Sequence, residues 1–104
     1  MIDHVMRFNM PSAIGKMAEL AHVVGAAVPG GMPEASAESF IGWLSALKAD
    51  LAIPATLSEY RAKRPVTHAD IGALADVAVH DICHQTNPRP CTREDFERLF
   101  ATAM

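Results

Sequence analysis

Residues 80–91, "HDICHQTNPRPC", hold the densest group of side chains in this sequence that could do chemistry. The group contains two histidines, two cysteines and an aspartate: His80, Asp81, Cys83, His84 and Cys91. On a helix, residues four apart share a face, so the imidazoles of His80 and His84 could bind one metal ion. Three interpretations follow: a metal site, a cysteine nucleophile with a histidine base, or an ordinary helix end.

The metal interpretation lacks ligands. A structural zinc site needs four protein ligands, and a catalytic site needs three plus water. His80 and His84 supply two, and Cys83 lies about 60° around a regular helix from His80. Cys91 lies beyond two prolines, and Asp81 occupies the position where the helical zinc-protease motif has glutamate. A small metal-binding helical protein that uses His80, His84 and a cysteine is kept as an alternative.

The nucleophile interpretation lacks a well-placed base. Adjacent side chains diverge by about 100° on a helix, so His80 is better placed than His84 to serve Cys83. At a helix C-terminus the dipole disfavours a thiolate and favours a charged histidine. The pattern therefore favours a helix end with structural histidines, and we assign no catalytic, cofactor-binding or metal residue. His4, His22 and His68 are isolated and are interpreted as packing or surface residues.

Every strong hydrophobic periodicity is helical. It predicts helices over about 11–24, 33–51, 67–83 and 92–103, and residues 2–9 indicate the last turns of an earlier helix. Pro11 is expected in a first turn and Gly25 at a C-terminal cap, and Thr67 and Thr92 are expected to cap the last two helices. The residues predicted to be buried are Ile14, Met17, Leu20, Ala21 and Val24, then Phe40, Trp43, Leu44, Leu47 and Leu51, then Ile71, Leu74, Ala75, Ala78 and Ile82, and finally Phe96, Leu99, Phe100 and Ala103. We expect an all-α bundle of four to five helices.

The composition excludes several classes of protein. The 104 residues fit one domain, and a net charge of −3 leaves no basic footprint for nucleic acid. Arg61, Lys63 and Arg64 are expected in a surface turn. Two cysteines form no disulfide framework, and no apolar run is long enough to span a membrane, so we expect a cytoplasmic protein. The mean hydropathy is positive, +0.12. We therefore expect self-association through exposed apolar helix faces.

Three segments carry a resemblance to a known family. "DHVMRFN", "DLAIPATLSEY" and "DIGALADVAVHDICHQTNPRPCTREDFERLF" occur in this order over essentially the whole sequence. Together they resemble the C-terminal portion of the iron-containing (group III) alcohol dehydrogenases, which include lactaldehyde reductases and maleylacetate reductases. The resemblance implies a two-domain enzyme. In it, an α/β domain binds NAD(P) and an all-helical domain carries a divalent metal, iron or zinc.

The resemblance also implies what this chain lacks and what it keeps. The metal ligands of the family, one Asp and three His, lie in helices before the "HVMRFN" segment, and His4 is not a ligand position. Neither those motifs nor the glycine-rich nucleotide loop is present. We therefore expect residues 1–104 to form one partial helical domain of an NAD(P)-linked, metal-dependent alcohol or aldehyde oxidoreductase, inactive alone. In the family, the cysteine that corresponds to Cys83 lines the substrate cleft.

Overall fold

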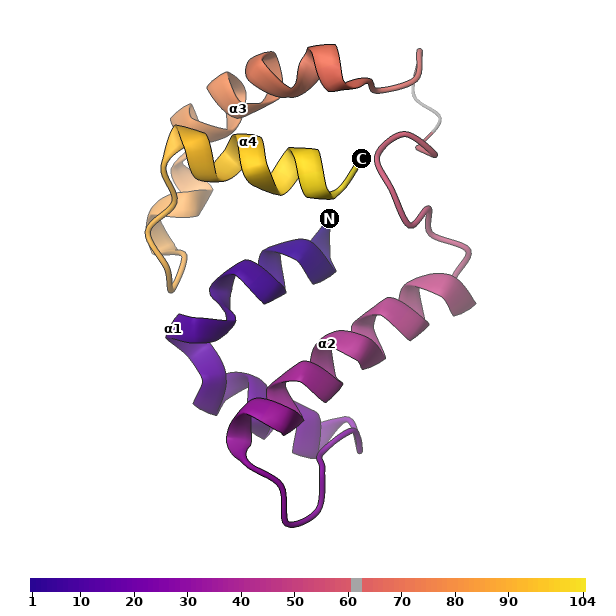
Figure 1. Cartoon of the computed structure of the whole chain (residues 1–104), viewed down its shortest axis with the longest axis vertical. Coiled ribbons are helices and arrows are strands. Elements are labelled where there is room, and N and C mark those ends of the chain that lie inside the picture. Colours follow the sequence, from indigo (N-terminus) through magenta and orange to yellow (C-terminus); the bar gives the residue numbers. More distant parts are fainter. Residues whose placement is uncertain (61–62) are drawn as a thin grey trace. The chain divides into compact units, whose positions relative to one another are not determined.

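The computed structural model describes residues 1–60 and 63–104, and these residues form helices without any strand (Figure 1). Because the described residues form only helices and turns, the all-α class predicted from the sequence is confirmed. The α-helices are α1 (Ile2–Val23), α2 (Pro33–Asp50), α3 (Ile71–His80) and α4 (Arg93–Thr102), and two 3₁₀ helices are η1 (His68–Asp70) and η2 (Ile82–Thr86). None of these helices is long and apolar enough to cross a membrane.

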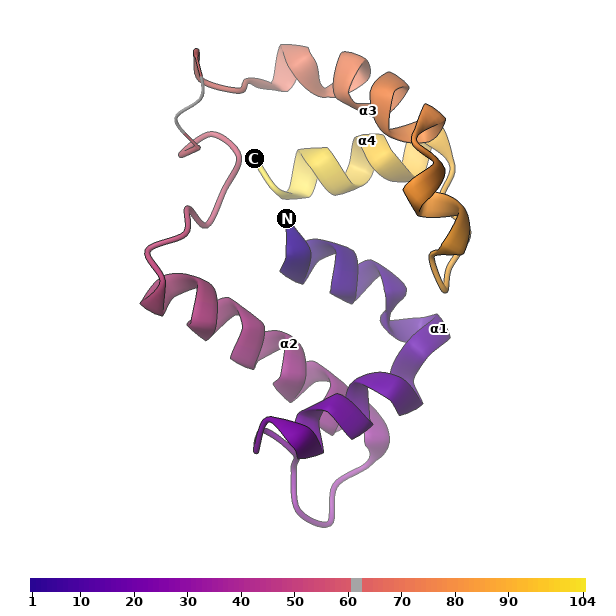
Figure 2. The same ribbon diagram turned by 180° about the vertical axis from the view of Figure 1, so that it is seen from behind.

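The chain divides into two compact units that differ in their helices. The first unit, Ile2–Ile53, contains α1 packed against α2. The second unit contains Pro54–Met104 and Met1, and in it α3 packs against α4 (Figure 2). Of the predicted basic turn, Arg61 lies outside the described residues, whereas Lys63 and Arg64 are exposed.

Helix α1 bends in its middle, as its ribbon shows in Figure 1. Pro11 lies inside the helix, and Ala13 has the non-helical backbone angles φ −144° and ψ 22°. Proline has no N–H to donate and its ring crowds the carbonyl four residues earlier, which kinks a helix. The structure therefore joins the two segments that the sequence predicted on either side of Pro11, and Pro11 does not begin a new helix.

Gly25 ends α1 as predicted. Its φ is +73°, in the left-handed region that glycine adopts without steric cost. The Gly25 amide donates to the carbonyl of His22 and the Ala26 amide donates to that of Ala21, at 3.2 and 2.8 Å. These two bonds form a Schellman motif and satisfy carbonyls that the helix end leaves unpaired.

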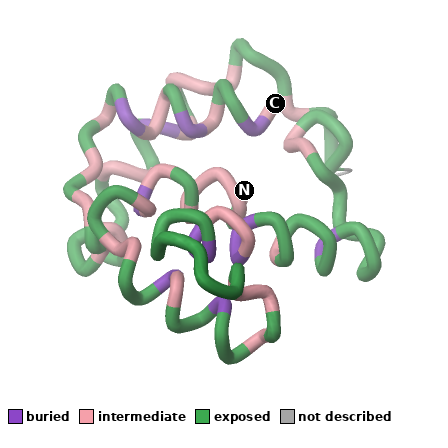
Figure 3. The backbone as a smooth tube through the Cα atoms, turned by 60° about the horizontal axis from the view of Figure 1, so that its bottom comes forward, coloured by how far each residue is buried: buried purple, intermediate pink, exposed green. Residues whose placement is uncertain are grey.

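The core of the first unit confirms only part of the face predicted for α2: Phe40 is buried and Leu44 packs against the core. The buried residues of this core are Met17, Ala21, Ala37, Phe40 and Ile41. Four residues predicted to be buried are exposed instead: Leu20, Trp43, Leu47 and Leu51. In Figure 3 the buried positions along α1 and α2 are separated by exposed and intermediate ones. Since the buried side of α2 is centred on Ala37 and Ile41, the row Trp43, Leu47 and Leu51 lies at its edge.

Two ion pairs of different burial join α1 to α2. Lys48 Nζ lies 2.9 Å from Asp3 Oδ1, and their side chains are only 10% and 19% exposed. Ser45 Oγ also donates to Asp3, at 3.3 Å. Arg7 and Glu38 form the second pair at 2.7 Å, with side chains 58% and 44% exposed. The first pair is thus largely removed from water and the second is not.

In the second unit, both predicted capping boxes are present. The Thr67 amide donates to Asp70 Oδ2 at 2.8 Å, and the Thr92 amide donates to Asp95 Oδ2 at 3.0 Å. Ala75, Leu99 and Ala103 are buried as predicted. Leu57 to Tyr60 form a single turn, and the Leu57 amide donates to the carbonyl of Ala103 at 2.7 Å.

Candidate functional site

The helix that carries the candidate residues ends earlier than predicted. Helix α3 stops at His80, whereas the periodicity predicted it to continue to Cys83. Asp81 has an extended backbone, with φ −75° and ψ 129°, and its Oδ1 accepts a hydrogen bond from the Cys83 amide at 2.8 Å. An aspartate that bonds an amide two residues ahead competes with the helix and caps the next one. Ile82, predicted to be buried, is consequently 75% exposed.

Side chains then hold the short helix η2 in place. Thr86 Oγ1 donates to the carbonyl of Cys83 at 3.3 Å, and the Asn87 amide donates to the carbonyl of His84 at 3.1 Å. Asn87 Nδ2 donates to the carbonyl of Arg89 at 2.6 Å. Pro88 follows Asn87 and disfavours a helical backbone there, and η2 accordingly ends at Thr86.

The two histidines bond to carbonyls of α3. His80 Nδ1 donates to the carbonyl of Asp76 at 2.7 Å, and His84 Nε2 donates to that of Val79 at 3.0 Å. The His84 ring also meets Phe96 edge to face, with centroids 5.4 Å apart. His80 lies in the last turn of its helix, as predicted, but the helix break removes the regular spacing that would place His84 on the same face.

These residues do not fit a metal site. Among residues 1–60 and 63–104, no three His, Cys, Asp or Glu side chains lie close enough together to hold a metal ion. His80 and His84 each use one ring nitrogen for a carbonyl. The alternative of a small metal-binding protein built on these histidines and a cysteine therefore lacks its third ligand in the described part of the chain.

Neither cysteine resembles an activated nucleophile. Cys83 is exposed, and a hydrogen bond to the neighbouring Asp81 carboxylate raises the pKa of its thiol. Cys91 is half-buried, and burial raises the pKa of its thiol. A nucleophilic cysteine needs the opposite shift, which nearby cations or a helix N-terminus provide.

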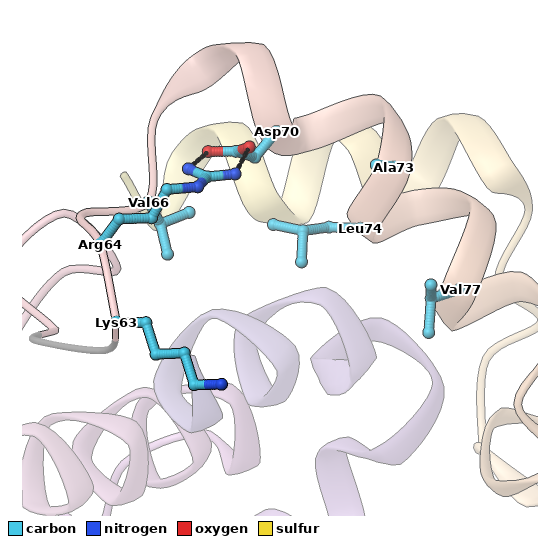
Figure 4. Close-up of a pocket in the computed structure, with 7 residues that line it drawn as sticks. All are labelled: Lys63, Arg64, Val66, Asp70, Ala73, Leu74 and Val77. Atoms are coloured by element: carbon cyan, nitrogen blue, oxygen red, sulfur yellow. Dashed lines mark hydrogen bonds and ion pairs between the residues drawn. The ribbon is translucent and has the colours of Figure 1, made fainter.

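The structure contains a cavity that the sequence did not indicate. It lies beside α3 in the second unit, has a volume of about 450 Å³, and is mostly apolar, with Val66, Leu74 and Val77 in its lining (Figure 4). At its rim Arg64 donates to both oxygens of Asp70, which holds the pKa of that carboxyl well below its usual range. Cys83 does not line this cavity. The only related signal in the sequence was Leu74, which the periodicity assigned to the core.

Known proteins match this chain along its whole length. The family model described as "Fe-containing alcohol dehydrogenase family, C-terminal" matches residues 1–104. Lactaldehyde reductase of Escherichia coli (strain K12) is 34% identical over 103 residues, and NAD-dependent methanol dehydrogenase of Bacillus methanolicus is 32% identical over 103 residues. Each match covers 99% of this chain and 26% of the relative.

A solved structure shows the same fold. The crystal structure of a 1,3-propanediol oxidoreductase superposes with a TM-score of 0.90 at 26% identity, over 99% of this chain and 26% of that one. This chain therefore spans about a quarter of the length of each of these relatives. Since the family model covers every residue, the chain belongs to the Fe-containing alcohol dehydrogenase family and corresponds to the C-terminal part of its members.

Proposed function

We propose that this chain supplies the C-terminal helices of an oxidoreductase that transfers hydride between NAD(P) and an alcohol or aldehyde. The enzyme would use a divalent metal ion, iron or zinc. The observation that carries this proposal is the family match over residues 1–104. In this proposal the two helical units are parts of one helical domain. The metal ligands and the nucleotide-binding domain belong to other parts of such an enzyme, so the 104 residues alone do not catalyse the reaction.

Within this enzyme, Cys83 is proposed to line the substrate cleft. Two features support this role beside the resemblance. The Cys83 side chain is exposed, and its backbone is held at both ends: its amide donates to the Asp81 carboxylate and its carbonyl accepts from the Thr86 hydroxyl. A fixed thiol is a small, weakly polar surface that an aliphatic alcohol can contact.

A chimera tests the proposal. The C-terminal quarter of E. coli lactaldehyde reductase, which this chain matches over 103 residues, is replaced by the chain. We expect NAD-linked lactaldehyde reduction by the chimera and none by the purified 104-residue chain, with iron or zinc and with NAD or NADP. A folded chimera without activity, or a chain that is active alone, would contradict the proposal.

Enlarging Cys83 tests the cleft role in the same chimera. Cys83→Leu is expected to raise KM more than it lowers kcat, because the added volume obstructs substrate binding. Ile82→Leu is the matched control, since Ile82 is the exposed neighbour in the same turn and its change conserves volume. Equal KM and kcat values for both variants would contradict the proposal that Cys83 lines the cleft. Independently, the DNA immediately upstream of the Met1 codon should encode, in frame, an α/β region followed by helices that carry the Asp and His ligands.

A second function, self-association, is favoured by the exposed row on α2. Trp43, Leu47 and Leu51 are 36%, 38% and 61% exposed and are spaced four residues apart on one side of the helix. Light scattering should show a dimer or larger oligomer that Leu47→Glu dissociates, whereas the control Ala46→Glu, also at an exposed position of α2, leaves it intact. A monomer at high concentration would contradict this function.

We also propose a cytoplasmic location. Both cysteines are free, as expected where cellular reductants keep thiols reduced. Fractionation of the source cells with an antibody to the chain tests this, and recovery outside the cytoplasm would contradict it.

A further inference from the structure

Helix α3 is apolar on every side, yet a single one of its residues, Ala75, is buried. Of its ten residues, Asp76 and His80 alone have polar side chains. A helix that is apolar all round normally lies in the interior of a protein and is covered on more than one side. Helix α4 covers the side of α3 that carries Asp76, which forms an ion pair with Arg93 of α4. Another side of α3 is therefore left for a further neighbour.

Helix α4 shows the contrasting pattern of a helix that needs one neighbour. Five of its ten residues are charged, and one of the two residues that it buries, Leu99, is apolar. Such a helix covers its apolar stripe with a single partner and turns its charged side to water. The surplus apolar surface of the second unit thus belongs to α3.

The cavity of about 450 Å³ follows one stripe of α3. Ala73, Leu74 and Val77 line it at the three- and four-residue spacing of one helix face, and Val66 adds a wall from the preceding loop (Figure 4). Val77 is 73% exposed. Since a protein cavity of about 150 Å³ already accepts benzene, this one has room for several apolar side chains.

The rim of the cavity is polar and held in place. Arg64 donates to both oxygens of Asp70, and the Thr67 amide donates to the same carboxylate. These bonds fasten the loop that carries Val66 to the start of α3, and Lys63 adds a second cation to the rim. An apolar centre inside a polar rim is the usual anatomy of a protein interface.

We propose that Val66, Ala73, Leu74 and Val77, the α3 seat, receive an apolar helix from the preceding part of the parent enzyme. The inference rests on the proposed function. The matches cover 26% of each relative, so about three quarters of such an enzyme lies outside these residues. Met1 belongs to the second unit, where that preceding part would join the chain. A helix fits because the ridges of one helix pack between residues spaced three and four apart on another.

Cysteine labelling compares the seat with and without its occupant. Val77→Cys is placed in the 104-residue chain and in the chimera with lactaldehyde reductase, and its alkylation by iodoacetamide is followed by peptide mass spectrometry. Val23→Cys is the matched control, since Val23 is a similarly exposed valine, at 81%, outside the cavity. We expect the thiol at position 77 to react at least tenfold more slowly in the chimera than in the chain alone. The thiol at position 23 should react alike in both.

A second variant tests the free chain. Val77→Asp should leave its midpoint of thermal unfolding within about 3 °C of the wild type, because the side chain is exposed there. A larger fall would show that the chain covers Val77 itself and would overturn the inference. Protection of Val77→Cys that grows with the concentration of the free chain would assign the seat to a second copy and would also overturn it.

The chimera separates this inference from the proposed function. A chimera that reduces lactaldehyde but alkylates at position 77 as fast as the free chain would overturn the α3 seat alone. An inactive, folded chimera with position 77 protected would contradict the proposed activity and support the seat. A chimera that does not fold would overturn the seat, since α3 would not fit its neighbour.

Discussion

Removing the charge of Lys48 should destabilise the first unit far more than removing that of Arg7. Lys48→Met keeps most of the aliphatic stem but leaves Asp3 as a largely buried carboxylate without its cation. Arg7→Met removes a cation whose pair with Glu38 is about half exposed. Such surface pairs contribute about 0–1 kcal/mol, because water and salt screen them.

The size of the Lys48 effect follows from the pKa of Asp3. Burial alone would raise that pKa, but the hydrogen bond from Lys48, a backbone hydrogen bond and the charge of Lys48 together outweigh it and lower the pKa from 3.8 to about 2. At about 1.4 kcal/mol per pKa unit, and allowing for the partial exposure of Asp3, the favourable interaction is about 2 kcal/mol. We expect Lys48→Met to lower the free energy of unfolding by about that amount.

Trp43 supplies the assay. It is the only tryptophan of the chain and lies on α2, so its fluorescence during urea unfolding reports on the first unit. The control Arg7→Met should change the midpoint little, and the double variant Asp3→Asn with Lys48→Met should recover part of the loss. Equal losses of stability for Lys48→Met and Arg7→Met would refute the reasoning that burial separates the two pairs.

Three further predictions use other features of the fold. The stability of the first unit should fall with acid between about pH 4 and pH 2. The ionised Asp3 carboxylate stabilises the fold above its unfolded pKa of 3.8, and this contribution is lost as the pH falls through its folded pKa of about 2. Trp43 fluorescence against pH measures the decline, which should be absent in Asp3→Asn. Gly25→Ala should cost about 1 kcal/mol in the same assay because φ at Gly25 is +73°, whereas Gly15→Ala, inside α1 with open space around it, should be neutral or stabilising. Thr92→Ala should cost about 1 kcal/mol and speed amide hydrogen exchange in the first turn of α4, and unchanged exchange there would count against the capping box.

The features predicted correctly from the sequence are those that local chemistry determines. A threonine with aspartate three residues later specifies a capping box through bonds within four residues, and both boxes are present. Gly25 likewise ends α1 through contacts with its own last turn. The break at Asp81 was missed although it is equally local, because the apolar pattern continues through Ile82 and the capping role of an aspartate there was not weighed against it.

The prediction for α2 was right for Phe40 and wrong for Trp43, Leu47 and Leu51, for a different reason. Apolar residues occupy more than half of the circumference of this helix, so periodicity does not decide between Ile41 and Leu47 as the centre of the core. In the structure Lys48 is buried on the same side of α2 as Ile41. Its counter-charge is Asp3, which lies 45 residues earlier in the chain. A contact of that separation is not visible in the local pattern of either helix.

Helix ends explain why histidines spaced for a metal ion need none. The last carbonyls of an α-helix have no partner within it, and a nearby ring N–H can supply one. His84 does this for Val79 across the break at Asp81, whereas His80 donates to the carbonyl of Asp76, one turn before the end of α3. The same break places Cys83 in an exposed turn beside a carboxylate, instead of on a helix face beside two imidazoles. The chemistry of this segment is therefore determined less by the spacing of its histidines than by the aspartate between them.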